Sequence, residues 1–160
     1  MTQPQLSLPG SDAKALMQLL ATWDNTTTIV LHGGCVFEFK GPFPAGKEGE
    51  GYFNLDGPVP GFHGHIRLDA VDHIYLQSRQ HRGRDSHAFC FQDKQGDNIF
   101  KVFLGRDSNG QLLESQLKTY LNIRDPLSLP NTGGSVSSIM SKRGPNSTNR
   151  TDCFALHQSM

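Results

Sequence analysis

Two histidines and an arginine recur at every second position of one short segment, Gly61-Phe62-His63-Gly64-His65-Ile66-Arg67-Leu68. In an extended strand alternate side chains share a face, so His63, His65 and Arg67 should point one way and the apolar residues the other. Imidazole ligates zinc, copper, iron and nickel, and a guanidinium pairs with carboxylates. The spacing alone leaves three alternatives open: a metal site, a site for haem or another anionic ligand, and a polar strand face that meets water.

Three further places carry side chains that can bind a ligand. Tyr52 in Gly51–Leu55 is a possible phenolate ligand for ferric iron, or an aromatic at a sheet edge with a local hydrogen bond. His32 stands beside the Gly-Gly pair at 33–34, an exposed position. The basic connection Arg79–Asp85 suits a phosphate, a propionate or an acidic protein patch, or is simply solvated.

Composition excludes several classes of protein. Lys and Arg number 15, as do Asp and Glu, so the net basicity typical of non-specific nucleic-acid binding is absent. No apolar run approaches the ~20 residues that cross a bilayer, and the first ten residues lack the pattern of a secretory signal. We therefore expect a cytoplasmic protein with no nucleic-acid partner and no membrane insertion. Three cysteines without a C-x-x-C pair argue against a disulfide framework and a cysteine-based zinc site.

Catalytic signatures are missing as well. The sequence contains no G-x-S-x-G, H-E-x-x-H, Walker A or G-x-G-x-x-G motif. No nucleophile stands at a motif spacing from a base. We therefore assign no catalytic residue from local patterns.

The elements that must position these residues are mostly strands. Apolar residues at spacings of three and four predict helices at about 12–23 and 110–122. Runs rich in β-branched and aromatic residues predict seven strands: 27–32, 35–40, 51–55, 62–68, 71–78, 86–92 and 98–104. We expect hairpins across residues 33–34 and 93–97, pairing of 62–68 with 71–78, and a loop from Gly41 into the charged segment Lys47–Glu50.

Because the strands are joined by loops too short for crossover helices, the predicted sheet is mainly antiparallel, and the class is α+β or a partly closed barrel. We expect one domain over residues 11–124. Residues 1–10 carry two prolines and predict a flexible tail. Residues 125–160 are rich in Ser, Asn, Gly and Thr over 131–150 and predict a polar, disordered tail.

Taken together, residues 23–121 resemble the small bacterial haem-utilisation proteins of the HutX/ChuX type. The resemblance rests on the order and spacing of several motifs rather than on one. These are Phe37-Glu38-Phe39-Lys40-Gly41, Pro44-Ala45-Gly46, Gly51-Tyr52-Phe53-Asn54-Leu55, Gly64-His65-Ile66-Arg67, His73-Ile74-Tyr75-Leu76, Phe100–Asp107 and Gln111–Gln116.

The resemblance implies a split-barrel-like half-domain that binds haem b (iron protoporphyrin IX) inside a bacterial cell and stores it or hands it on. It also implies a homodimer and a transient contact with a downstream haem-degrading or acceptor protein. His65, in the Gly-His-Ile-Arg motif, becomes the leading iron ligand, Tyr52 the second and His32 the third. Arg67 or the Arg79–Arg84 loop is expected near the propionates, and Phe62 on the porphyrin face.

Two alternatives stay open. Opening the porphyrin ring needs a distal pocket that steers bound oxygen, and the sequence does not reveal one, so a haem-degrading enzyme of the same broad fold is the first alternative. The second is a metal-binding module built on His63 and His65, or a flavin-binding module.

Overall fold

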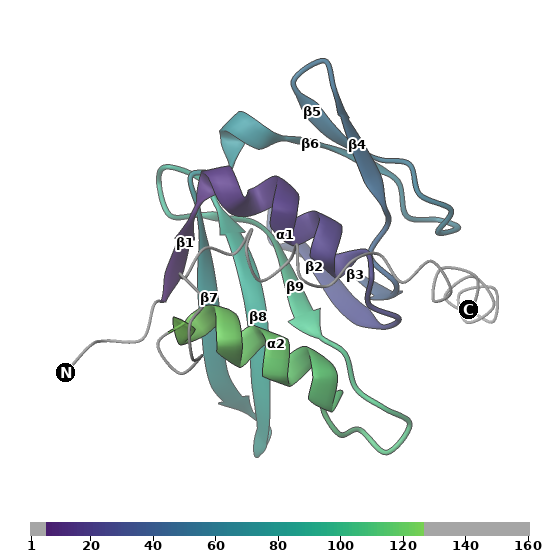
Figure 1. Cartoon of the computed structure of the whole chain (residues 1–160), viewed down its shortest axis with the longest axis vertical. Helices are drawn as coiled ribbons and strands as arrows, with labels where there is room; N and C mark the ends of the chain where they lie inside the picture. The colour runs from purple at the N-terminus through teal and green to yellow at the C-terminus, as the bar shows by residue number, and fades with distance from the viewer. Residues whose placement is uncertain (1–5, 127–160) are drawn as a thin grey trace.

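Two antiparallel sheets and two helices make up the part of the chain that the computed structural model describes, residues 6–126 (Figure 1). The larger sheet has six strands in the order β1-β7-β8-β9-β2-β3, and the smaller has the order β4-β5-β6. The strands are β1 (Ser7–Pro9), β2 (Thr26–His32), β3 (Cys35–Gly41), β4 (Gly46–Gly49), β5 (Tyr52–Leu55), β6 (Gly64–Arg67), β7 (His73–His81), β8 (Arg84–Gln92) and β9 (Asn98–Leu104). The helices are α1 (Ala13–Leu20) and α2 (Glu114–Arg124), with 3₁₀ turns at Gly10–Asp12 and Leu68–Ala70.

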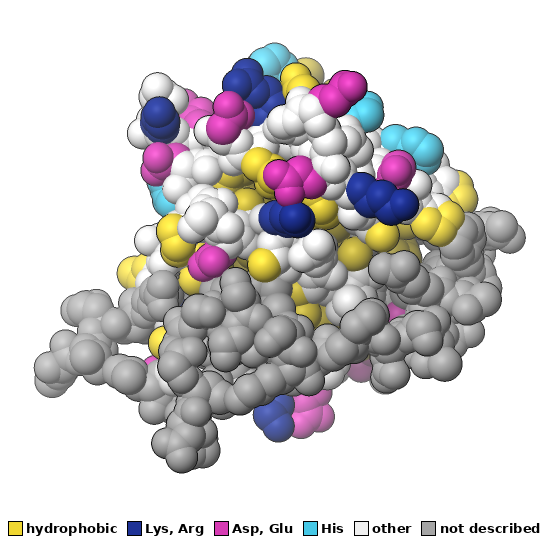
Figure 2. Space-filling view, turned by 45° about the horizontal axis from the view of Figure 1, so that its top comes forward, with side chains coloured by type: hydrophobic (Ala, Val, Ile, Leu, Met, Phe, Trp, Pro, Cys, Tyr) yellow, Lys and Arg dark blue, Asp and Glu magenta, His cyan; other side chains and the backbone are white. Residues whose placement is uncertain are grey.

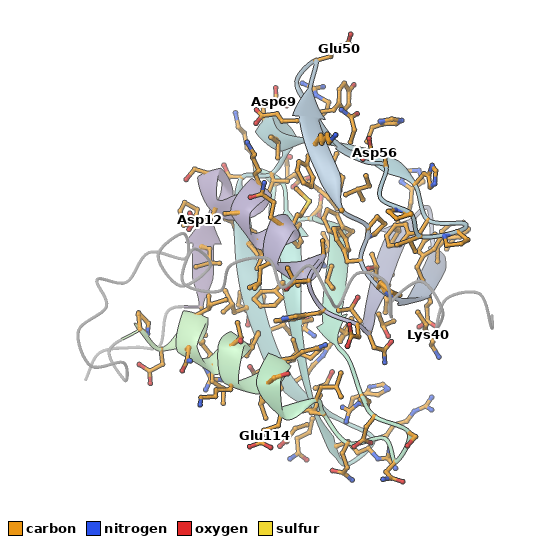
Figure 3. The ribbon with its side chains drawn as sticks, turned by 45° about the vertical axis from the view of Figure 1, so that its right-hand side comes forward. Asp12, Lys40, Glu50, Asp56, Asp69 and Glu114 are labelled. Carbon is orange, nitrogen blue, oxygen red and sulfur yellow. The ribbon has the colours of Figure 1, made fainter. Side chains whose placement is uncertain are left out.

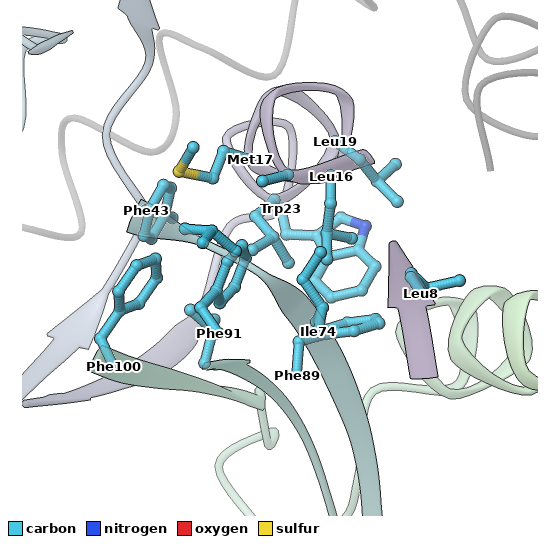
Figure 4. Packing of buried hydrophobic residues seen from close by; sticks show 14 of the residues in the cluster. Leu8, Leu16, Met17, Leu19, Trp23, Phe43, Ile74, Phe89, Phe91 and Phe100 are labelled. Carbon is cyan, nitrogen blue, oxygen red and sulfur yellow. The ribbon is translucent and has the colours of Figure 1, made fainter. Parts of the chain in front are cut away.

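The core lies between one face of the six-stranded sheet and both helices. Phe89 in β8 contacts Trp23, which follows α1, with ring centroids 6.3 Å apart, and Tyr120 in α2, at 5.2 Å. Beside it, Phe91 of β8 stacks on Phe100 of β9 at 4.2 Å (Figure 4). Since one strand face contacts both helices, α1 and α2 cover the same side of the sheet.

Several polar groups that this packing buries are paired at the α2 interface. The Tyr120 hydroxyl donates to the Gln77 carbonyl at 2.9 Å, and Gln116 in α2 donates to the Asn25 carbonyl and accepts from the Gly105 amide. A buried donor or acceptor left unpaired costs roughly 1–3 kcal/mol, so these bonds fix where α2 lies on the sheet.

The three-stranded sheet is held to the core by its inward side chains. Phe53 and Leu55 of β5 are buried, and Phe53 lies opposite Ile66 of β6. An ion pair of 2.8 Å also joins Lys14 of α1 to Glu48 of β4, with both side chains about half exposed. Exposed ion pairs contribute little, so apolar packing rather than this pair positions the small sheet.

The α+β class, the antiparallel pairing and the hairpins across residues 33–34 and 93–97 are confirmed. The count of seven strands is too low by two. Residues 7–9, expected in a flexible tail, form β1, where Leu8 is only 2% exposed. The charged segment from Lys47, expected in a loop, belongs to β4, an edge strand, where charged side chains remain in water.

One predicted pairing is wrong. The strand 62–68 shortens to β6 and pairs with β5, while β7 pairs with β1 and β8. The connection Arg79–Asp85 is mostly strand, because β7 and β8 continue to a two-residue turn at Arg82-Gly83, both with positive φ. The helices are α1 and α2 rather than 12–23 and 110–122. The predicted tail at 125–160 lies almost wholly outside the described residues.

A titratable side chain lies at the junction of β7, β8 and α2. The His87 ring packs 4.9 Å from the Tyr120 ring, and its Nδ1 lies 2.9 Å from Ser78 Oγ, which also accepts from Arg124. Burial lowers the pKa of His87, and the charges of Arg124 and Arg106 lower it further, against an opposing effect of Asp85. The folded protein therefore favours neutral His87.

The first prediction tests whether residues 7–9 belong to the fold. Leu8→Ala should lower the free energy of unfolding by about 2–5 kcal/mol, because it leaves a cavity under β1. The matched control is Leu6→Ala, whose side chain is 45% exposed and should change stability by no more than about 0.5 kcal/mol. Urea unfolding measures both. Equal, small effects would mean that β1 does not contribute to the core.

The second prediction concerns pH. Because the pKa of His87 is lower in the folded than in the unfolded protein, the unfolded chain binds more protons below pH 6.5, the ordinary histidine value. The stabilising contribution of neutral His87 is present above that pH and is lost as pH falls through the folded pKa. Urea unfolding at several pH values should show a smaller loss of stability on acidification in His87→Gln than in the unsubstituted protein. Parallel curves would refute this role.

Candidate functional site

One face of the three-stranded sheet gathers most of the predicted ligands. Tyr52 lies opposite Arg67, and Asn54 lies opposite His65, in the register of β5 and β6. All four side chains point away from Phe53, Leu55 and Ile66, which face the core, as the alternation of the sequence predicts. We call Tyr52, Asn54, His65 and Arg67 the outer face of the small sheet.

Asn54 orients His65. The Nδ2 amide of Asn54 donates to the carbonyls of Lys47 and Gly49, at 3.3 Å each, so its Oδ1 turns toward His65. Nδ1 of His65 lies 2.7 Å from that oxygen. An amide oxygen only accepts, so the proton of neutral His65 is on Nδ1 and the lone pair is on Nε2. The outer face therefore presents a fixed, exposed imidazole nitrogen that can bind a metal.

Tyr52 and Arg67 flank this imidazole. The rings of Tyr52 and His65 meet edge to face with centroids 6.3 Å apart, and Tyr52 is 38% exposed. Arg67 donates from Nε and Nη2 to the two carboxylate oxygens of Asp69, at 3.2 and 3.0 Å. This hydrogen bonding and the charge of Arg67 lower the pKa of Asp69. Arg67 thus already holds a carboxylate of its own chain.

Other predicted residues lie apart from this cluster. His63 is exposed just before β6 and makes no hydrogen bond or ion pair within residues 6–126, and His32 ends β2 at the Gly-Gly turn. The Arg79–Arg84 segment is the far end of the β7–β8 hairpin, at the opposite end of the molecule from β5 (Figure 1).

Phe62 was expected on an exposed porphyrin face, and this expectation is wrong. The side chain is 9% exposed and stacks on Phe39 of β3 at 4.6 Å, with Phe43 edge-on at 5.8 Å. The exposed aromatic ring in this region is Phe37 of β3, at 55%. It shares the strand face of Phe39, so the β2–β3 hairpin, rather than the segment before β6, presents an apolar surface.

The sequence alone assigned no role to two residues at this sheet face. Asn54 belongs to the outer face, and strand alternation puts it on the same side as Tyr52. Lys47 was predicted in no strand, and the register of β4 places it opposite Asn54, beside the outer face, with its side chain exposed. Lys47 makes no ion pair within the described residues, which distinguishes it from Arg67.

Charge on the molecule is dispersed rather than concentrated. Figure 2 shows basic and acidic side chains interspersed on the face that it presents, with histidines toward its upper margin. Figure 3 places Glu50 at the tip of the small sheet and Asp69 near it, far from Glu114 at the start of α2. Within residues 6–126 no three His, Cys, Asp or Glu side chains form a metal cluster.

A family model described as Haem utilisation ChuX/HutX matches residues 6–123. The chain belongs to this family. The matched range contains the whole outer face of the small sheet. No helix within the described residues is long and apolar enough to span a membrane.

Two proteins similar to this chain have names that describe heme transport and heme binding. The intracellular heme transport protein HutX of Vibrio cholerae serotype O1 is 41% identical over 111 residues, which are 69% of this chain and 58% of HutX. The chain thus spans less than two thirds of that relative. The structure of the heme binding protein ChuX superposes with a TM-score of 0.69 at 33% identity, over 78% of each chain.

A more distant similarity shows the fold alone. PhuS, a heme-binding protein from Pseudomonas aeruginosa, aligns with a TM-score of 0.62 at 16% identity, over 76% of this chain and 35% of PhuS. The ChuX/HutX fold therefore occupies about a third of this larger protein.

The third prediction tests the orientation of His65. Nitrogen-15 NMR at neutral pH should show His65 with its proton on Nδ1 and a bare Nε2, because Nδ1 donates to Asn54. Asn54→Ala removes the acceptor and should shift His65 toward the other tautomer, while exposed His63 in the same spectrum should not change. An unaltered His65 spectrum in Asn54→Ala would contradict the assignment.

Proposed function

We propose that this protein binds haem b within the bacterial cytoplasm and passes it on without degrading it. The observation that carries the proposal is the hydrogen bond from His65 Nδ1 to Asn54, which leaves Nε2 free on an exposed sheet face. Histidine is a common proximal ligand of haem iron, and the group that bonds its other nitrogen fixes the ring. The names of HutX and ChuX, which describe heme transport and heme binding, support the same function.

His65 is the proposed iron ligand, and Tyr52 is the alternative on the same face. The rings are too close for two porphyrins, so one haem per outer face follows. A single ligand on an open face suits a carrier, since haem leaves when one iron–ligand bond breaks. A neighbouring phenol also offers the iron a second ligand during release. His32 and His63 stay predicted secondary ligands.

The propionates of haem need cations beside the iron ligand. Lys47 is exposed on the outer face, and its ammonium makes no ion pair within the described residues. Arg67 already bonds both carboxylate oxygens of Asp69 through Nε and Nη2, so a propionate would share the guanidinium with Asp69 through its remaining N–H groups or displace that carboxylate. We therefore assign Lys47 the first propionate contact and Arg67 the second.

We also propose a homodimer and a transient acceptor, a haem-degrading or haem-binding protein. The surface that supports dimerisation is the face of the β2–β3 hairpin on which Leu31 and Val36 are opposed and exposed, on the other side from Val30 and Phe37. β3 is an edge strand of the large sheet, and exposed apolar edges favour pairing with another chain. The outer face of the small sheet belongs to other strands, so the same protein can dimerise and still present its haem.

The fourth prediction is a hemin titration of the apo-protein followed by absorbance. The unsubstituted protein should give a saturable Soret shift at one hemin per chain. His65→Ala should weaken binding by at least about tenfold and change the band position, because the iron loses its ligand. The matched control is His81→Ala, an exposed imidazole at the far end of the β7–β8 hairpin, which should keep the unsubstituted spectrum.

Three outcomes of this titration would contradict the proposal. A broad, unsaturating rise in absorbance means that hemin is not bound specifically. An unchanged spectrum in His65→Ala removes His65, and Tyr52→Phe then shows whether the phenol is the ligand. Loss of the Soret band with formation of an open-chain tetrapyrrole, after ascorbate is added to the complex, would identify a haem-degrading enzyme instead.

A further inference from the structure

The β2–β3 hairpin ends in a histidine and a cysteine that face each other. His32 and Cys35 are directly opposed in the strand register, across the turn Gly33-Gly34. We propose that these two side chains form a binding site for a soft, monovalent metal ion, specifically Cu(I), held by the Cys35 thiolate and the His32 imidazole. The site lies on other strands than His65 and Tyr52 and does not rest on the proposed haem function; His32 is the one predicted haem ligand that it uses.

The turn gives the pair its geometry. Both glycines have positive φ, 58° and 80°, which is the backbone of a two-residue hairpin turn. Residues that flank such a turn are opposed, with Cβ atoms about 4.5–5.5 Å apart, and their side chains leave the same face of the ribbon. That separation lets a sulfur at about 2.3 Å and a ring nitrogen at about 2.0 Å reach one metal ion.

Both side chains are available. Each is exposed, and the His32 ring makes no hydrogen bond or ion pair with any described residue. The thiol of Cys35 has one weak contact, with the Gly33 carbonyl at 3.9 Å. Apart from each glycine and its chain neighbours, no described atom lies within 4 Å of where a Cβ would stand on Gly33 or Gly34, so the outside of the turn is open.

The ligand set selects the metal. Thiolate is a soft ligand that favours Cu(I) or zinc, and imidazole suits both. Zinc takes four ligands in structural sites, yet no third His, Cys, Asp or Glu joins this pair within residues 6–126. Cu(I) is stable with two ligands. On binding, the thiol releases one proton and a copper–sulfur bond forms, with no change in oxidation state.

The surroundings also suit a soft cation of low charge. Val30 and Phe37 occupy the next positions along the same strand face, and Phe37 is largely exposed. The thiolate and Cu(I) together are neutral, so this apolar neighbourhood penalises the bound site less than it would a divalent ion. The hairpin tip thus combines two soft ligands with an apolar flank.

The test is an anaerobic titration with Cu(I), in competition with a colorimetric Cu(I) chelator. All measurements use the background variant Cys153→Ser, so that this thiol, which lies outside the described residues, cannot bind copper. Cys90 needs no substitution, because it is buried, with 1% of its surface exposed. One Cu(I) per chain is expected. Cys35→Ser and His32→Ala should each weaken binding by at least about 100-fold, more than loss of a supporting residue costs. His63→Ala, the matched control, should bind Cu(I) as the background does.

Each other outcome overturns the proposal. Unchanged affinity in Cys35→Ser means that copper binds elsewhere. Loss in Cys35→Ser with unchanged affinity in His32→Ala means that a lone thiol binds, not the pair. One copper ion for two chains, with dimers appearing only in its presence, means a shared site. Because the substitutions lie at an exposed turn, circular dichroism should show all variants folded, and no hemin is present in the assay.

Discussion

Burial of alternate residues in the small sheet decides which side chains the protein presents to its ligand. Phe53 and Ile66 are opposed and face the core, so their neighbours Tyr52, Asn54, His65 and Arg67 must face outward. A register shift of one residue in either strand would move all side chains of that strand to the opposite face of the sheet. The cost of exposing a phenylalanine, about 1.5–3 kcal/mol, therefore protects the orientation of His65, the proposed iron ligand, as well as the fold.

The same constraint extends to the rest of the molecule through aromatic contacts. Phe62 leads into β6 and stacks on Phe39 of β3, while Phe43, which leads into β4, stacks on Phe100 of β9. The small sheet is thus attached to the large one at the β3–β4 connection and through its own β5–β6 loop. Since Phe89 joins the large sheet to α1 and α2, one continuous apolar core supports the exposed imidazole.

Sequence periodicity predicted which side of a strand each side chain takes better than it predicted which strands pair. The alternation around His65 correctly placed it beside Arg67 and opposite to the apolar residues, since burial follows a period of two in any strand. The sequence predicted that this strand pairs with residues 71–78, whereas it pairs with β5. Strand pairing depends on contacts between residues distant in sequence, which periodicity does not report. Strands β1 and β4 were missed for another reason: a proline and several charges are tolerated at sheet edges, where propensity is a poor guide.

The role of Asn54 illustrates what sequence patterns cannot supply. The residue type allows many hydrogen bonds, and only the two β4 carbonyls of Lys47 and Gly49, which accept from its amide nitrogen, turn its oxygen toward His65. An imidazole oriented by a neutral amide is a weaker electron donor than one held by a carboxylate, because the amide draws the ring proton less strongly. In the proposed haem carrier this difference would favour release: His65 is oriented toward an incoming iron, while a weaker iron–nitrogen bond would let an acceptor compete.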